Sequence, residues 1–107
     1  MLATTITARH CEIPAELRAR ADEVCRRLGA QASRPLEAAV TFDMDGHEST
    51  AEIRLHSARG DLFVATGEGK DHRSALDRAE DKLKRQLEKR HTRPGRGRAA
   101  LADAADA

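Results

Sequence analysis

Residues 36–55 constrain the fold more than any other part of the chain, because their polarity alternates on both sides of a turn dipeptide. The apolar members are Leu36, Ala38, Val40, Phe42 and Met44 before the turn, and Ala51, Ile53 and Leu55 after it. A period of two is typical of a strand with one buried face. Asp45-Gly46 favours a tight hairpin, with positive backbone angles at both residues. This segment therefore predicts two antiparallel strands with one face toward a core.

Flanking segments predict one more strand on each side of this hairpin. Residues 2–7 predict a short first strand. After a turn at Gly60, residues 62–66 predict the third strand of a meander, in which we expect Phe63 and Ala65 to face the core.

Two further segments have the apolar spacing of amphipathic helices. The first begins at Pro14 and extends to about Leu28, where Gly29 supplies a left-handed exit. The second follows Asp71, whose carboxylate caps the first turn, and extends to about His91. The predicted fold is α+β: a two-layer β-α-β-β-β-α sandwich, with a four-stranded mixed sheet and both helices on one face.

The length of 107 residues fits one small domain, which we assign to residues 1–91. Residues 92–107, an Arg/Gly stretch followed by Ala and Asp, predict a disordered tail. The N-terminus has no continuous apolar run, so we expect a soluble cytoplasmic protein. Cys11 and Cys25 match no metal motif and are too few for a disulfide framework, so we expect two reduced thiols.

Charge is segregated along the chain, although the net charge is only +1. Residues 70–98 hold eleven Lys or Arg against five Asp or Glu, whereas residues 32–69 hold three against seven. Two Phe and no Trp or Tyr leave almost no aromatic surface on which nucleic-acid bases stack. Any nucleic-acid contact should therefore be made by cations with phosphates.

The last helix sorts its side chains into three stripes at about 100° per residue. The core stripe is Leu76, Ala79, Leu83 and Leu87; the acidic flank is Asp77, Asp81 and Glu88; the basic stripe is Arg78, Lys82, Arg85 and Lys89. A helix built only for solubility would interleave its charges, and adjacent like charges forgo that gain. The basic stripe covers about 16 Å, which matches several phosphates along a nucleic-acid backbone. The alternative is a solvated helix face.

The first helix is less informative, because its charges have the spacing of ordinary ion pairs. Glu16 with Arg20, and Glu23 with Arg27, predict i,i+4 pairs. Arg26 has no such partner, and we expect it with Arg27 at the helix C-terminus, where cations are favoured with or without a ligand.

Two blocks of the chain match a known family pattern. They are Ile6-Thr7-Ala8-Arg9-His10 with Glu12-Ile13 and Leu17-Arg18, and Asp71, Ala75 and Asp77 with Asp81-Lys82-Leu83-Lys84-Arg85-Gln86-Leu87-Glu88-Lys89. These blocks resemble the opening and the final helix of the ribosome hibernation promoting factors, also called ribosome-associated inhibitors. Without the C-terminal dimerisation domain of the long forms, the chain resembles a short form. The resemblance implies the same fold.

The resemblance also implies a function and a partner. Such a protein binds the small ribosomal subunit in the messenger and transfer RNA channel, inhibits translation in idle cells, and places basic residues of both helices on ribosomal RNA. By position, Arg27, Lys82, Arg85 and Lys89 match the family's basic sites. With Arg26, Arg78 and Arg90 added from the charge pattern, the candidate rRNA-binding residues are Arg26, Arg27, Arg78, Lys82, Arg85, Lys89 and Arg90. A separate ribosome-dimerising factor stays open as a second partner.

The chain departs from the family pattern where the last helix begins, with Asp71-His72-Arg73 in place of Asp followed by Met and Tyr. Two other binding functions stay open: a sigma-factor modulating protein and a double-stranded-RNA-binding module, although the latter begins with a helix. The five His are scattered without metal-ligand spacing, so we expect neither an enzyme nor a cofactor.

Overall fold

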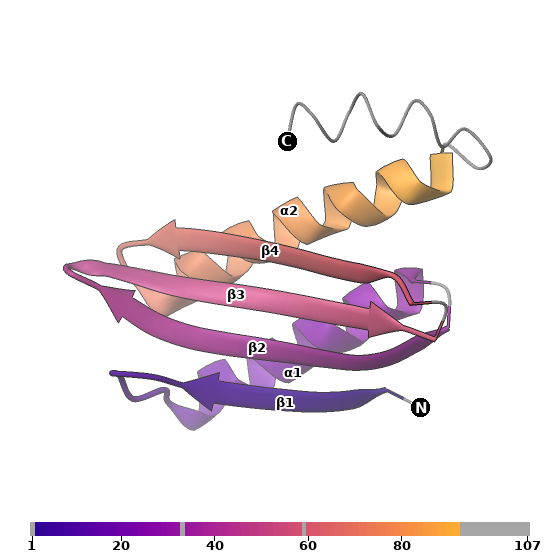
Figure 1. Cartoon of the computed structure of the whole chain (residues 1–107). Coiled ribbons are helices and arrows are strands. Elements are labelled where there is room, and N and C mark those ends of the chain that lie inside the picture. The colour runs from indigo at the N-terminus through magenta and orange to yellow at the C-terminus, as the bar shows by residue number, and fades with distance from the viewer. Residues whose placement is uncertain (1, 33, 59, 93–107) are drawn as a thin grey trace.

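The computed structural model describes residues 2–32, 34–58 and 60–92, with side chains described as far as Lys89. Six elements follow one another: β1 (Ala3–Ala8), α1 (Ala15–Gln31), β2 (Pro35–Asp45), β3 (Glu48–Ser57), β4 (Leu62–Gly69) and α2 (His72–Thr92). The predicted order is confirmed (Figure 1). The predicted disordered tail lies, from residue 93 onward, outside the described residues.

The four strands form one mixed sheet in the order β1-β2-β3-β4. β1 is parallel to β2, and β3 is antiparallel to both of its neighbours. Figure 1 shows both helices behind this sheet, with its other face uncovered. α1 packs mainly against β1 and β2, and α2 against β3 and β4. The two-layer sandwich with both helices on one face is therefore confirmed.

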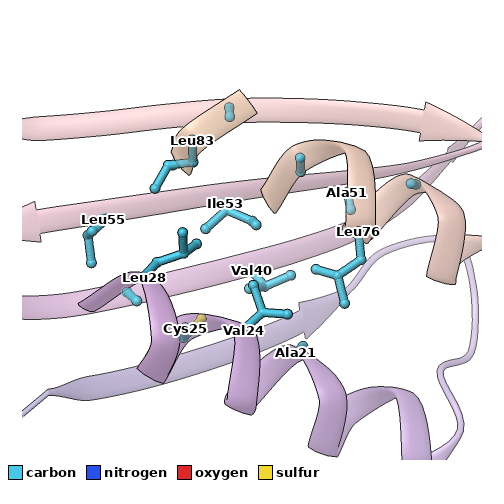
Figure 2. Packing of buried hydrophobic residues seen from close by; sticks show 14 of the residues in the cluster. Ala21, Val24, Cys25, Leu28, Val40, Ala51, Ile53, Leu55, Leu76 and Leu83 are labelled. Atoms are coloured by element: carbon cyan, nitrogen blue, oxygen red, sulfur yellow. The ribbon is translucent and has the colours of Figure 1, made fainter. Parts of the chain in front are cut away.

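The core fills the space between the sheet and the helices (Figure 2). Predicted core residues that are buried in the structure are Ala38, Val40, Phe42, Ala51, Ile53, Leu55, Ala65, Leu76, Ala79, Leu83 and Leu87. Phe63 packs against this cluster while partly exposed, so the predicted inner face of β4 is confirmed. At one level of the sheet, Val40 lies between Ile6 of β1 and Ile53 of β3. Each strand thus adds one apolar layer per two residues.

The β2–β3 hairpin closes through a two-residue loop, Gly46 and His47, since Asp45 pairs with Glu48. Gly46 has a φ of 66°, whereas Asp45 and His47 have negative φ. A positive angle at the first loop position alone matches the type II′ hairpin turn, which favours Gly there. The predicted hairpin is confirmed, but the predicted positive angle at Asp45 is wrong because Asp45 is the last paired residue of the strand.

Leu36 does not face the core, contrary to its place in the alternating pattern. Pro35 pairs with Ser57 and Glu37 with His56, so Leu36 is an extra residue in a β-bulge. Its side chain is 48% exposed. The bulge shifts the alternation of inward and outward side chains in β2 by one residue, so this alternation is regular only from Ala38 onward.

Gly29 does not end α1, which continues to Gln31 and is followed by the extended residue Ala32. A Cβ at position 29 would lie 3.0 Å from Cδ2 of Leu2, tighter than ordinary packing. The glycine therefore allows the start of the chain to pack against the helix, and the predicted left-handed exit is wrong.

Glycines of β4 also hold α2 close to the sheet. A Cβ on Gly67 would lie 2.2 Å from the Ala75 carbonyl oxygen and 2.6 Å from the Ala79 nitrogen. At the start of α2, the Ser74 amide donates to Oδ1 of Asp71 at 2.8 Å, which confirms the predicted cap. This hydrogen bond lowers the pKa of Asp71 below its ordinary value. Cap and close approach together set the orientation of α2.

Candidate nucleic-acid interface

All four residues of the basic stripe on α2 are exposed, as predicted. Arg78 and Lys82 also donate hydrogen bonds to the sheet, and so does the neutral residue Gln86, which was not among the predicted site residues. The bonds are Arg78 Nη1 to the Glu68 carbonyl oxygen (2.7 Å), Lys82 Nζ to the Thr66 carbonyl oxygen (2.9 Å) and Gln86 Nε2 to the Val64 carbonyl oxygen (2.9 Å). We call these three hydrogen bonds the edge ladder.

The edge ladder follows from a match between two repeats. Donors recur every four residues along α2, which advances about 6.0 Å. Acceptors recur every two residues along β4, which advances about 6.7 Å. Since the two elements run in opposite directions, three successive donors meet three successive carbonyl oxygens. The i,i+4 spacing of long donor side chains at positions 78, 82 and 86 was the available signal in the sequence.

The edge ladder covers an edge of the sheet, because β4 is an outer strand. Uncovered edge carbonyls invite pairing with another chain, and charged side chains on the edge reduce that tendency. Each donor side chain nevertheless keeps capacity for a ligand, since a guanidinium has five N–H donors and an ammonium has three. Arg78 and Lys82 therefore retain their charge and donors toward solvent.

Lys84 and Arg85 are the most available cations on the described part of α2. Both are exposed, and neither forms a hydrogen bond or ion pair with another described residue. Lys89, one turn beyond Arg85, is exposed and has an interaction of its own. Arg78, Lys82, Arg85 and Lys89 share one exposed side of α2, and Lys84 lies next to it on the flank of Asp77, Asp81 and Glu88.

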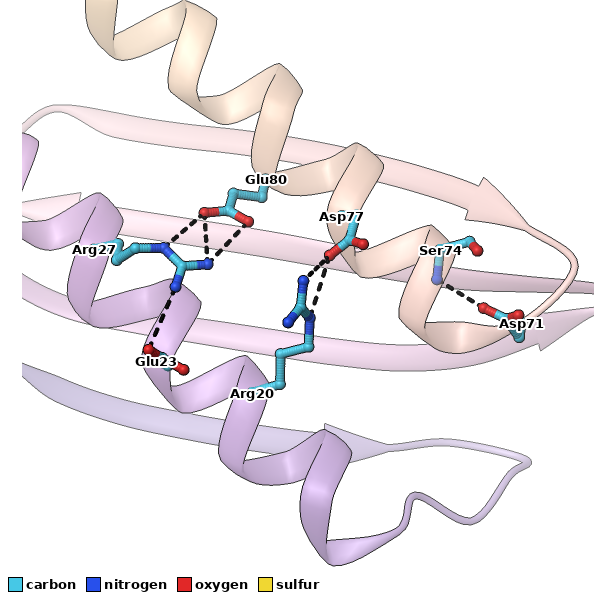
Figure 3. Close-up of polar contacts among 7 residues, drawn as sticks. All are labelled: Arg20, Glu23, Arg27, Asp71, Ser74, Asp77 and Glu80. Atoms are coloured by element: carbon cyan, nitrogen blue, oxygen red, sulfur yellow. Dashed lines mark hydrogen bonds and ion pairs between the residues drawn. The ribbon is translucent and has the colours of Figure 1, made fainter.

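The surface between the helices has a different character, because arginines of α1 are bound by carboxylates of α2 (Figure 3). Arg20 donates through Nε and Nη2 to Oδ1 of Asp77 at 3.3 and 2.8 Å. This bond raises the pKa of Arg20 above its ordinary value. Arg27 donates to both carboxylate oxygens of Glu80 at 3.1 to 3.3 Å and lies 3.5 Å from Glu23.

Of the two ion pairs predicted within the first helix, the structure contains one. The Glu23–Arg27 pair is confirmed. The Glu16–Arg20 pair is wrong, because Arg20 faces α2 and its guanidinium binds Asp77. Arg27 also contacts two carboxylates, which reduces the positive charge that it presents to a further anion.

Arg26 and Arg90 are the other two rRNA-binding candidates predicted from the sequence. Arg26 was expected to be unpaired, but its Nη2 lies 2.8 Å from Oδ2 of Asp22, one helical turn earlier. Nor does Arg26 lie in the last turn of α1, because the helix continues to Gln31 and that turn has no basic residue. The side chain of Arg90 lies outside the described residues.

Titratable groups elsewhere bind the protein's own structure. His10 Nδ1 lies 2.9 Å from Oδ1 of Asp43, and this contact lowers the pKa of the Asp43 carboxyl. His72, where the family pattern has an apolar residue, donates from Nε2 to the Asp43 carbonyl oxygen at 2.9 Å and meets the Phe42 ring edge-on. This histidine therefore joins the start of α2 to the end of β2.

Cys11 and Cys25 are free thiols, as expected, and burial raises the pKa of Cys25 to about 12. Such a thiol is not a nucleophile at neutral pH. Within the described ranges, no cluster of three His, Cys, Asp or Glu side chains could hold a metal ion. No described helix is long and apolar enough to span a membrane.

Comparison with solved structures gives close agreement in fold. The N-terminal domain of Protein Y from Thermus thermophilus is 28% identical, with a TM-score of 0.71 over 83% of this chain and 98% of that one. A ribosomal subunit interface protein from Coxiella burnetii has a TM-score of 0.74 over 86% of this chain and 99% of that one. At 18% identity, that second likeness supports the fold alone. A search of curated proteins found no match.

A family model described as sigma 54 modulation protein / S30EA ribosomal protein matches residues 4–94. The match begins in β1 and passes the end of α2, so it includes every helix and strand that carries the surface described above. The chain therefore belongs to the sigma 54 modulation protein / S30EA ribosomal protein family.

Proposed function

We propose that this protein binds the small ribosomal subunit in the channel that messenger and transfer RNA occupy, and so inhibits translation in idle cells. The observation that carries the proposal is the outer surface of α2, where exposed cations project away from the core. Membership in a family described in part as a ribosomal protein supports the same partner. A ribosome-bound role places the protein in the cytoplasm.

The chemistry of α2 favours phosphate contacts over base recognition. Side chains with ammonium or guanidinium groups neutralise phosphates and release counterions, whatever the RNA sequence. An α-helix presents such groups at a spacing of about 6 Å per four residues, close to the distance between successive phosphates of one strand. We therefore expect α2 to follow an RNA backbone.

Within this proposal, the contact residues are ranked by their surroundings. Lys84 and Arg85 lead, because no other described residue binds them. Arg78 and Lys82 contribute through the donors that the edge ladder leaves unused. Arg27 instead positions α1 against α2, since Glu80 and Glu23 already neutralise it.

The test reverses two charges and measures binding to purified small subunits. Lys84→Glu with Arg85→Glu should abolish cosedimentation at physiological salt, while circular dichroism and thermal unfolding stay unchanged because both side chains are exposed. The matched control is Arg9→Glu with Arg54→Glu, two exposed arginines outside α2, which should cosediment normally. Full binding by the α2 double variant would overturn the proposed interface.

A second candidate function has its own observation. The family description also names sigma 54 modulation, and the open sheet face carries more acidic than basic side chains. Its charged residues on β2, β3 and β4 include Glu37, Asp43, Glu52 and Glu68 against Arg54. A protein partner with a basic surface would suit that face. Capture from lysate with and without ribonuclease separates the two: loss of the partner after ribonuclease supports the ribosome, and a ribonuclease-resistant sigma factor supports the alternative.

A further inference from the structure

A shallow cleft of about 530 Å³ lies where α1 ends and β2 begins. Its apolar wall includes Leu2, Ala30, Pro35 and Leu36, and its charged groups are Arg26 and Arg34. No carboxylate belongs to the described lining. The cleft therefore combines apolar surface with positive charge.

Two departures from regular structure form this cleft. The β-bulge at the start of β2 turns Leu36 out of the core alternation and leaves it 48% exposed. Arg34 has a φ of 52°, a left-handed conformation that is costly for a residue with a Cβ. The Arg34 carbonyl oxygen accepts a hydrogen bond from the Ala58 amide at 2.8 Å, which holds this conformation in place. Both departures bring a side chain to the cleft.

We infer that this cleft binds one unpaired nucleotide of RNA. The base lies against the apolar side chains of Leu36 and Pro35, and its flanking phosphates meet Arg26 and Arg34. Guanidinium planes also stack on unpaired bases, which compensates for the absence of Trp and Tyr. The Asp22 contact uses one edge of the Arg26 guanidinium, and other donors remain for a phosphate. The volume lies within the ordinary range for sites that hold small ligands.

An RNA ligand fits better than an acidic peptide because of where the cleft lies. Figure 1 shows the C-terminal ends of α1 and α2 at the same end of the domain. An RNA strand that follows the outer surface of α2 thus reaches the end of the domain where the cleft opens. The inference rests on the proposed function and adds a base contact to the phosphate contacts of α2.

The experiment compares two synthetic RNA hairpins that differ only by one unpaired nucleotide in the stem. The full chain should bind the bulged hairpin about tenfold more tightly than the paired one, near the lower end of the gain from one base stacked on an aromatic side chain, because the cleft offers aliphatic and guanidinium surface instead. Leu36→Glu and Arg34→Asn should each remove this preference without weakening binding to the paired hairpin. Asn tolerates the left-handed conformation of position 34, so the fold is retained.

Matched controls use residues with the same exposure and charge outside the cleft. Leu62 is 51% exposed and lines a different depression, so Leu62→Glu adds the same charge elsewhere. Arg54→Asn removes one exposed arginine from the open sheet face. Both control variants should keep the preference for the bulged hairpin.

The outcomes separate this inference from the proposed function. Equal binding of both hairpins by the full chain overturns the cleft assignment and leaves the α2 interface intact. Failure to bind either hairpin or the small subunit overturns the proposed function itself. A third probe is the peptide Asp-Glu-Leu-Glu-Asp with amide chemical shifts as readout. If it shifts the amide signals of Arg34 and Leu36 and the bulged RNA does not, the ligand is a protein and the inference is wrong.

Discussion

The response of binding to salt tests whether the outer cations of α2 contact phosphates. Beyond its first turn, α2 has five described exposed cations, namely Arg78, Lys82, Lys84, Arg85 and Lys89. If each neutralises one phosphate, the logarithm of the binding constant should fall with the logarithm of salt concentration at a slope of about −3.5 to −4.5. Affinity should then drop roughly 100- to 500-fold between about 50 and about 200 mM salt.

Removing two of these charges should change the slope by a calculable amount. With Lys84→Gln and Arg85→Gln, three contacts remain, so the slope should become about −2.1 to −2.7. The same rise in salt should then weaken binding only about 20- to 40-fold. Neutral glutamines avoid the added repulsion of glutamates, so the change in slope counts contacts.

The assay is fluorescence anisotropy of labelled protein titrated with purified small subunits over a series of salt concentrations. Arg9→Gln with Arg54→Gln serves as the control and should keep the slope of the unmodified protein. A double α2 variant with that same slope would refute the assignment of these side chains to phosphates. A slope near zero for the unmodified protein would indicate a partner bound without phosphate contacts.

Three further predictions concern the structural basis of this surface. Replacing Arg78, Lys82 and Gln86 by Ala removes the edge ladder and should lower the free energy of unfolding by about 1.5 kcal/mol, at about 0.5 kcal/mol per exposed hydrogen bond; an unchanged urea midpoint would contradict it. Gly67→Ala should lower the free energy of unfolding by about 3 kcal/mol or more, because the added Cβ would meet the backbone of α2. A melting temperature within about 1 °C of that of the unmodified protein would instead show that α2 shifts freely to make room. The Asp71 carboxylate stabilises the fold while ionised because its folded pKa is lowered, so Asp71→Ala should destabilise at neutral pH. That difference should be complete above the ordinary carboxyl pKa and vanish as pH falls through the folded pKa; a pH-independent difference would exclude the cap as its cause.

The fold was predictable because its signals are local. Alternation in β2 and β3, the turn glycine at position 46, and the i,i+4 apolar stripe of α2 each depend on residues close in sequence. The inward faces of these elements were therefore right. Errors arose where a distant contact overrode the local pattern: Leu2 packs on Gly29 within the helix, and a bulge against β3 expels Leu36.

The sequence by itself determined the order of the elements, the core faces and the presence of cations along the last helix, because periodicity sorts side chains onto faces without reference to the rest of the chain. Only the tertiary structure decided what the cations of both helices bind. Arg20 and Arg27 meet carboxylates of a helix more than fifty residues away, whereas Arg78 and Lys82 reach carbonyl oxygens of β4. Helix packing and strand register decide which carboxylates and carbonyl oxygens lie near each cation. A long side chain then pairs with whichever of these groups the packed fold brings within its reach.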